Sequence, residues 1–226
     1  MRIILLGPPG AGKGTQAQKI VNKFNLYQAS SGDLLRNEIK NKSDVGKKIE
    51  QIIFQGDFVT DDIVNKILKK VIINPLYRNK IIFDGYPRNM TQAENLEIML
   101  NADNQSINFI LFLKVNRKII EKRILGRIIC EKCNKTFNEY LNKEEIDNHK
   151  CGRNYLKKRK DDNQEAIIIR YDEYMKKTKP VLDFFSPRSY FHEIDGSQKI
   201  HEITSKIEQI LTVKDIDFKR TSYIKG

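Results

Sequence analysis

Residues 2–15 read RIILLGPPGAGKGT, a short aliphatic run that ends in a glycine-rich loop. Arg2 to Leu6 has the composition expected of a buried parallel strand. From Lys13 to Phe24 the apolar residues recur at helical spacing, so we expect a helix directly after the loop. Strand, loop and helix in this order predict the first unit of an α/β fold.

The loop itself is suited to phosphate. Its glycines leave backbone N–H groups open to phosphate oxygens at the start of a helix, and Lys13 would reach the outer phosphates. The strict P-loop pattern places Ser or Thr directly after the lysine, whereas here Gly14 comes before Thr15. A turn that merely joins strand to helix is the alternative, and a lysine in this register argues against it. The loop therefore predicts binding of a nucleotide.

Later apolar runs indicate more strands of the same sheet, namely Lys80 to Phe83, Asn108 to Leu113 and Tyr190 to Ile194. With helical segments between them, they predict an α/β protein: a three-layer P-loop core around a central parallel sheet. Residues 30–59 read as polar helical pieces, and residues 127–162 contain all three cysteines with little periodicity. We interpret both stretches as inserts that could cover a site.

The composition limits the class of protein without choosing a ligand. A chain of 226 residues can bury a core without disulfides or oligomerisation, and a net charge of +12 suits polyanions of any kind. The apolar run at the N-terminus is too short for a signal peptide or a membrane span of ~20 residues. We expect a cytoplasmic protein. The chain after about Val213 is basic and lacks a helical stripe, so we expect a loosely attached or disordered tail.

Three segments outside the loop carry groups for a second ligand. Ser31 and Arg36 could meet beside a monophosphate, the guanidinium as a bidentate donor. Asp84 follows an expected strand, where α/β proteins bind ligands. Gln92 comes four residues after Arg88, so both could address one ligand if a helix begins between them. Each residue alone would be read as an ordinary surface or turn residue.

Phosphoryl transfer requires positive charge around the phosphates more than covalent chemistry. Arg123 and Arg127, at i and i+4, would share one helix face and could point into one cleft. Arg159 and Arg170 could join them; a solvated basic face is the alternative. Asp84 is the best candidate to hold Mg²⁺ through water. No general base is expected, because the attacking group is a phosphate oxygen.

The cysteines suggest a metal site. Cys130 and Cys133 form a CxxC pair, and Cys151 follows with His149 two residues before it. Tetrahedral zinc favours such ligands, and the ion would be structural, holding an insert too thin to fold alone. An insert without metal and a redox-active pair are the alternatives, although a thioredoxin-like context is missing.

The sequence GPPGAGKGTQA resembles the loop of adenylate kinases, in which a glycine follows the lysine. The resemblance, to the long-lid bacterial type within the nucleoside-monophosphate kinases, extends from Met1 to about Leu211. It implies reversible transfer between ATP with Mg²⁺ and AMP, giving two ADP, by a monomer that binds neither nucleic acid nor membrane. It also implies a core of residues 1–29, 60–126 and 163–213, an NMP-binding insert of residues 30–59, a lid of residues 127–162 and a basic tail of residues 214–226.

The resemblance also implies roles for individual residues. The ATP-binding set is Gly10, Ala11, Gly12, Lys13, Gly14, Thr15, Arg123, Arg127, Thr136, Phe137 and Gln198. The AMP-binding set is Ser31, Gly32, Arg36, Asp57, Phe58, Val59, Gly85, Tyr86, Pro87, Arg88, Gln92, Arg159 and Arg170. The catalytic set is Lys13, Asp84, Arg88, Arg123, Arg127, Arg159 and Arg170, with Asp33 and Asp161 as candidate partners of the arginines.

Two departures from the family pattern bear on specificity and metal. Ser31 replaces a threonine common in the family and keeps its hydroxyl, which favours AMP over pyrimidine monophosphates. Zinc-containing lids of the family normally carry a second ligand pair two residues apart, and the corresponding position here is Asn148. His149 is the preferred fourth ligand, with Asp147 or Asn154 as alternatives.

Other functions remain open on the sequence alone. The enzyme could use another monophosphate, or GTP as donor. A nucleic-acid-binding protein could use the basic charge, but no recognition motif is present. A P-loop ATPase with water as acceptor would not need the segment from Asp84 to Arg88.

Overall fold

The computed structural model describes residues 1–55, 57, 59–159 and 162–223, with residues 213–223 described as backbone only. A five-stranded sheet of order β2-β3-β1-β4-β8 forms its centre, and every neighbouring pair is parallel. This confirms the expected α/β class. The strands are β1 (Arg2–Leu6), β2 (Tyr27–Ser30), β3 (Ile81–Asp84), β4 (Phe109–Lys114) and β8 (Phe191–Asp195).

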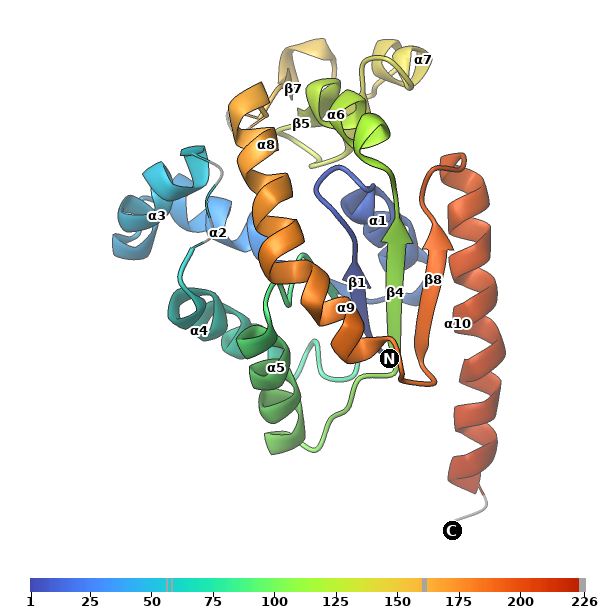
Figure 1. Ribbon diagram of the computed structural model, residues 1–226. Helices are drawn as coiled ribbons and strands as arrows, with labels where there is room; N and C mark the ends of the chain where they lie inside the picture. The colour runs from blue at the N-terminus through green and yellow to red at the C-terminus, as the bar shows by residue number, and fades with distance from the viewer. Residues whose placement is uncertain (56, 58, 160–161, 224–226) are drawn as a thin grey trace.

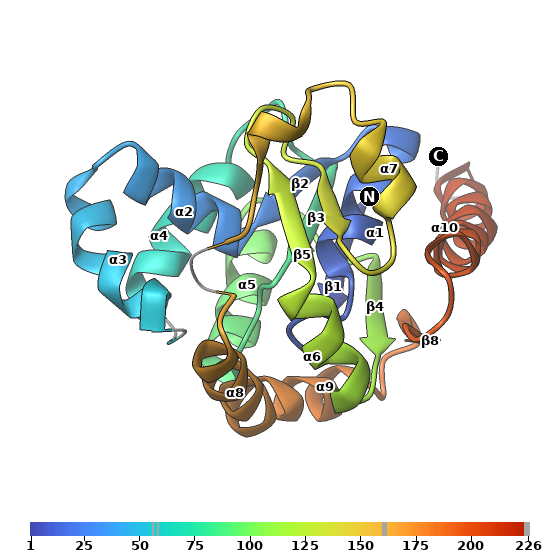
Figure 2. The same cartoon turned by 90° about the horizontal axis from the view of Figure 1, so that it is seen from above.

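Helices cover both faces of the sheet (Figures 1 and 2). Along β1, Ile3 packs toward α1 and α10, whereas Ile4 packs toward α4, α5 and α9. Both faces are therefore apolar, as a buried parallel sheet requires. The helices are α1 (Lys13–Phe24), α2 (Ser31–Lys40), α3 (Asp44–Gln55), α4 (Asp61–Ile72), α5 (Met90–Ala102), α6 (Arg117–Leu125), α7 (Lys143–Asp147), α8 (Gln164–Glu173), α9 (Lys179–Phe185) and α10 (Ile200–Tyr223), with a short 3₁₀-helix η1 (Arg153–Tyr155) and a π-helical segment η2 (Tyr174–Thr178) between α8 and α9.

The sequence pattern missed one strand of the central sheet. β2 lies at the edge of the sheet, where only Ala29 and Ser30 are buried and Tyr27 and Gln28 are partly exposed. A four-residue strand with half its side chains near solvent has no continuous apolar run, which explains why periodicity did not reveal it.

The two stretches expected to be inserts differ in structure. Residues 31–55 form the helix pair α2 and α3, and Gly46 of α3 lies so close to the backbone at Glu38 of α2 that a Cβ atom would clash. The second stretch forms a separate antiparallel sheet of order β6-β5-β7, made of β5 (Arg127–Cys130), β6 (Thr136–Asn138) and β7 (Leu156–Lys157). This small sheet lies at the top of Figure 1, beyond the end of α6.

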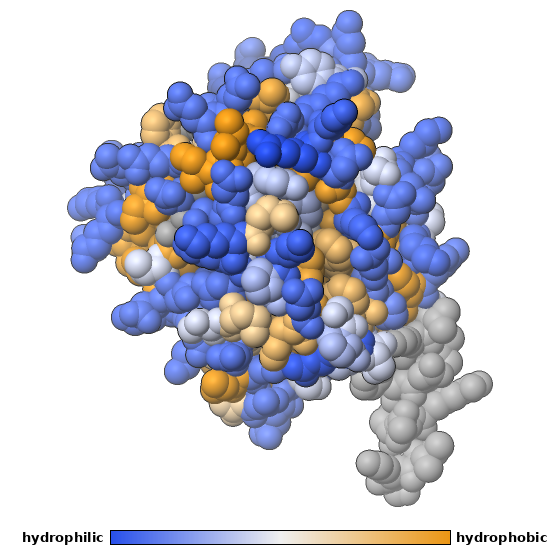
Figure 3. Space-filling model, viewed as in Figure 1, coloured by the Kyte–Doolittle hydropathy of each residue, from blue (hydrophilic) through white to orange (hydrophobic). Residues whose placement is uncertain are grey.

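The end of the chain differs from expectation. α10 continues as a helix to Tyr223, although the sequence after Val213 shows no helical stripe; loose attachment of this tail stays a prediction. Side chains there are not described. Among the described residues, no helix is long and apolar enough to cross a membrane. Figure 3 shows hydrophilic side chains over most of one face, with apolar groups scattered between them.

Candidate active site

The carboxyl ends of β1 and β3 open into one large cleft of about 1700 Å³. The loop of residues 7–15 forms its floor, α2 forms one side and the small sheet of β5, β6 and β7 forms the other. Parallel strands bring their carboxyl ends to one edge, so segments far apart in sequence meet here.

The glycine loop is held close to its surroundings. Gly10 (φ 74°) and Gly12 (φ 94°) adopt left-handed conformations that favour glycine. A Cβ atom at Gly10 would lie 2.8 Å from Ile124 Cγ1, so no side chain fits there. Gly12 precedes α1, and no side chain caps that helix, which leaves its first N–H groups available to an anion.

Lys13 and Asp84 face each other across the loop. Lys13 Nζ donates to Gly7 O at 2.7 Å and to Pro8 O at 2.9 Å. The pKa of Lys13 is lowered to about 8, chiefly by burial; Asp84 opposes this shift and Arg88 contributes to it. Burial raises the pKa of Asp84, against the attraction of Lys13. Burial therefore disfavours the charged form of both groups, and each charge is partly stabilised by the other.

On the α2 side, Ser31, Gly85 and Arg88 form a compact cluster. Ser31 Oγ donates to Gly85 O at 2.6 Å, and Arg88 Nε donates to the same oxygen at 2.7 Å. Gly85 has φ 71°, and a Cβ there would lie 3.2 Å from Ser31 Oγ and 3.1 Å from Arg88 Nη2. Thr178 Oγ1 donates to Arg88 O at 2.7 Å and so positions the arginine backbone. The Tyr86–Pro87 peptide bond is cis.

Gln92 lies beneath this cluster. α5 begins at Met90, as the expected pairing of Arg88 with Gln92 required. Gln92 is 2% exposed; its Oε1 accepts from Arg88 N at 2.8 Å, and its Nε2 donates to Asp61 Oδ1 at 2.6 Å. Its amide is thus engaged with protein, and contact with a base stays a prediction.

The remaining predicted residues lie at different depths. Val59 and Tyr86 are buried, Asp57 is exposed, and Phe58 lies outside the described residues. Gln198 lines a separate hollow of about 380 Å³ beside β8 and α10. Those that line the large cleft are Gly10, Ala11, Gly12, Lys13, Gly14, Thr15, Gly32, Arg36, Asp84, Gly85, Pro87, Arg88, Arg123, Arg127, Thr136, Phe137, Arg159 and Arg170.

Arg123 and Arg127 reach the cleft in a way that the sequence did not predict. α6 ends at Leu125, and Arg127 belongs to β5, so the two arginines do not share a helix face as their spacing suggested. The chain changes structure at Gly126, where a Cβ would clash with the Tyr140 ring. Arg123 Nη1 donates to Gly196 O at 2.8 Å and to Ala11 O at 3.3 Å, next to the loop.

Two acidic residues hold the other arginines. Asp162, 1% exposed, accepts from Arg127 Nε at 2.6 Å and from Arg170 Nη1 at 3.4 Å. Asp33 Oδ1 lies 2.6 Å from Arg36 Nη2 and 3.6 Å from an Arg159 nitrogen. The arginines are thus pre-oriented around the cleft by carboxylates.

Sequence reasoning named Asp33 but missed Asp162, Gln28 and Asp61. Asp161, which it proposed, lies outside the described residues. In the sequence, Asp162 lies between Arg159 and Arg170, and this position could have indicated that it pairs with arginines of the site. Gln28 donates to Asp84 Oδ2 at 2.9 Å, and nothing in the sequence indicated this contact, because it joins two strands.

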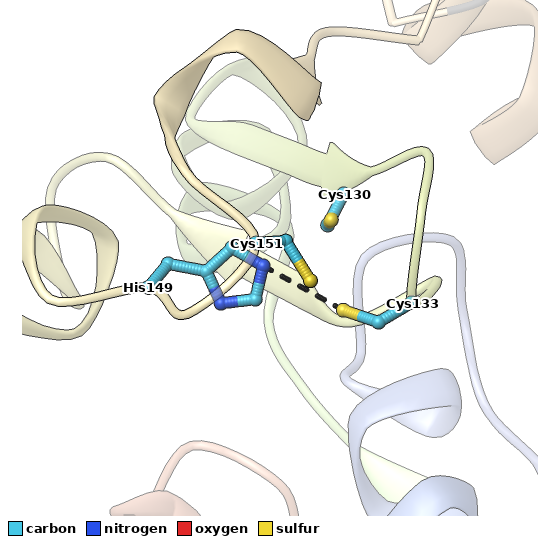
Figure 4. Close-up of side chains that lie close together, drawn as sticks. All are labelled: Cys130, Cys133, His149 and Cys151. Atoms are coloured by element: carbon cyan, nitrogen blue, oxygen red, sulfur yellow. Dashed lines mark hydrogen bonds between the residues drawn. The ribbon is translucent and has the colours of Figure 1, made fainter.

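A cysteine and histidine cluster occupies the small sheet. The ligand atoms of Cys130, Cys133, His149 and Cys151 lie within 4.8 Å of one another (Figure 4). His149 Nε2 is 3.6 Å from Cys133 Sγ. Burial opposes ionisation of Cys130, but hydrogen bonds from His149 and nearby backbone lower its pKa to about 6. The alternative ligand Asp147 is paired with Arg153.

A phosphate loop at the edge of a parallel sheet, facing an arginine-lined pocket in the same cleft, defines the class of P-loop phosphotransferases. The family profile described as adenylate kinase matches residues 5–190. The chain belongs to the adenylate kinase family and is a phosphotransferase acting on ATP and AMP.

Individual relatives agree with the profile. The chain is 60% identical over 213 residues to an adenylate kinase of Pelagibacter ubique (strain HTCC1062), covering 94% of this chain and 100% of the relative. It is 38% identical over 213 residues to one of Listeria monocytogenes serotype 4b (strain CLIP80459), covering 93% and 99%. It is 37% identical over 214 residues to one of Rhizobium rhizogenes (strain K84 / ATCC BAA-868), covering 94% and 99%.

Proposed function

We propose that this cleft moves the terminal phosphoryl group of ATP to AMP by positioning both nucleotides and neutralising charge in the transition state. The observation that carries the proposal is that arginine side chains converge on Lys13 of the phosphate loop. Arg88 lies in the loop after β3, Arg127 in β5 and Arg170 in α8, and each lowers the pKa of Lys13. Asp84 and Asp162 offset part of this positive charge, and a transferring phosphoryl group between the cations would be stabilised by it.

The donor side uses the loop. N–H groups of residues 10–15 would hold the ATP phosphates, with Lys13 and Arg123 on the outer oxygens. Thr136 and Phe137 would lie beside the adenine, with the backbone at Gln198 as a further contact. Asp84, a buried carboxylate near Lys13, fits a role in holding Mg²⁺ through water, and the ion would neutralise phosphate charge.

The acceptor side uses the cluster beside α2. Arg36 and Arg88 would bind the AMP phosphate, and Ser31, with its hydroxyl on Gly85 O, would shape the site beside them. Residues 30–59 would act as the NMP-binding insert and residues 127–162 as the lid, excluding water when closed. The wider AMP-binding set is Gly32, Asp57, Phe58, Val59, Tyr86, Pro87, Gln92, Arg159 and Arg170.

The lid would carry a structural zinc ion. Three cysteines and His149 present four ligand atoms in a compact group, which matches tetrahedral zinc. A sheet with so little buried area needs such a link. We further propose that the enzyme is a cytoplasmic monomer that binds neither nucleic acid nor membrane; a column profile with light scattering tests the oligomeric state.

A coupled assay of ADP formation tests the reaction. ATP is offered with AMP, UMP, CMP or GMP in turn, and without any acceptor as a measure of hydrolysis. AMP should give the highest kcat/KM, and the reaction without acceptor should be negligible. Arg88→Ala should abolish AMP-dependent turnover, whereas Arg78→Ala, an exposed arginine outside the cleft, should not. ATP consumption that persists in Arg88→Ala would refute the acceptor site.

A further inference from the structure

The metal cluster and the predicted donor-base residues belong to one hairpin. Cys130 ends β5 and Thr136 begins β6. Between them the turn is closed by Asn134 N donating to Cys130 O at 2.8 Å and by Cys130 N donating to Lys135 O at 3.0 Å. The cysteine pair and the strand that lines the cleft are therefore joined by the same hydrogen-bonded turn.

His149 contacts both parts of this region. Its Nε2 lies 3.6 Å from Cys133 Sγ, and its ring meets the Phe137 ring edge-on, with centroids 4.9 Å apart at 68°. Figure 4 shows the imidazole directed at the sulfur atoms from a separate segment of the chain. Phe137 is 2% exposed, and Lys135 Nζ lies 4.9 Å from its ring centroid. The Phe137 ring is therefore packed against His149 and Lys135.

The hairpin is also joined to the phosphate loop's helix. Gln18 of α1 donates from Nε2 to Asn134 O at 2.9 Å. The turn that carries Cys133 thus touches the element that begins at Lys13. Ser31, Gly85 and Arg88 lie on the α2 side of the cleft, where they are hydrogen-bonded to one another.

We propose that His149 is a positioning residue for the donor nucleotide, which couples metal binding to ATP binding. A metal ion held by Cys130, Cys133, His149 and Cys151 fixes the imidazole, and the imidazole holds Phe137 beside the base. Without the ion, the ring can rotate and Phe137 loses one wall of its site. The inference rests on the zinc and donor sites proposed above.

Coupling between two binding sites is reciprocal, and it can be measured as a ratio of dissociation constants for one ligand with and without the other. The quantity is the Kd for ATP of metal-free protein divided by that of zinc-loaded protein, measured by calorimetry after removal of excess metal and chelator. We expect a ratio of about 5 to 10 for the natural sequence, at the lower end of typical coupling. The same ratio for AMP should stay within about twofold, because its site lies on the other side of the cleft.

Two variants separate the ring from the metal. His149→Cys keeps a zinc ligand but removes the imidazole, and Phe137→Leu keeps all four ligands but removes the contacting ring. Both should bind zinc, and in both the ATP ratio should fall to about 1, within the scatter of independent sites. A full ratio in either zinc-loaded variant would overturn the proposal. If His149→Cys does not bind zinc, the result with Phe137→Leu decides.

The controls keep this test distinct from the proposed function. Metal analysis of the natural sequence shows whether zinc binds; a protein without zinc would overturn the metal site and this inference together. ADP formation from ATP and AMP is measured on the same samples. A protein that makes ADP and binds zinc, but has an ATP ratio of 1, would overturn only the coupling.

Discussion

The phosphate loop and the small sheet of β5, β6 and β7 face the same cleft but are built differently. The loop follows β1, whose last four residues are buried, and Gly7 and Gly10 lie so close to their neighbours that a side chain would clash. In the described residues 127–159, only Cys130, Phe137 and Asn138 are buried. The small sheet has ion pairs and the cysteine cluster in place of a larger core.

This difference fits what each region has to do. A phosphate cradle made of backbone must keep its shape before the ligand arrives, because preorganised dipoles need no rearrangement during reaction. A cover must move, and a thin sheet with few apolar contacts opens at low cost. Changes to the loop should therefore affect chemistry, and changes to the lid should affect stability and closure.

Lys13→Met should have the largest effect and tests the loop side of the comparison. The substitution keeps the length of the side chain and removes its charge, so kcat should fall by about 10²–10³ or more. The fold should persist, because the substitution removes a charge whose burial is unfavourable. Steady-state kinetics and circular dichroism measure this, with exposed Lys70→Met of α4 as the matched control. A variant with near-normal kcat would remove Lys13 from the mechanism.

Removal of the lid metal should act on the other region alone. A chelator should unfold the small sheet, because metal binding supplies much of the free energy that folds such a unit. Hydrogen exchange should accelerate in residues 127–159, while β1, β3 and β4 stay protected. Equal loss of protection in β1 would show that lid and core unfold together.

Asp162→Asn should have an intermediate effect on stability, because Asp162 links Arg127 of the small sheet to Arg170 of α8. The carboxylate is 1% exposed and receives Arg127 and Arg170, so its loss leaves two partly buried cations without this partner. Because both arginines keep some solvent, we expect a loss of about 1–3 kcal/mol in the free energy of unfolding, below the 3–5 of a fully buried pair. Denaturant titration measures it, with exposed Asp172→Asn of α8 as control. No change would mean that the pair adds nothing.

The pH dependence should give the smallest effect. Burial lowers the pKa of Lys13 from 10.5 to about 8, so the free enzyme loses this charge as the pH rises through about 8. The value of kcat/KM for ATP should then fall about tenfold per pH unit, while kcat should bend at higher pH because bound phosphates favour the charged lysine. The unfolded chain holds this proton up to about 10.5, so the contribution of Lys13 to stability rises between pH 8 and 10.5. Lys13→Met should lack the inflection.

Much of the core could be predicted because its signals are local. β1, the glycine loop and α1 follow one another within Arg2 to Phe24, and buried parallel strands show as aliphatic runs. The chain could not reveal β2, an edge strand with exposed residues, or the helical end of α10. The spacing of Arg123 and Arg127 was misleading, because Gly126 ends the helix between them.

The candidate site also divides into features that the sequence determined and features that only the tertiary structure decided. The sequence by itself determined the ingredients: a glycine loop with Lys13, a set of arginines, and three cysteines with a nearby histidine. Only the tertiary structure decided the pairings, such as Asp162 with Arg127 or His149 with Phe137, since these contacts join segments whose separation carries no periodic signal. Backbone preference acts over a few residues, whereas charge pairing and ring packing depend on where distant segments meet.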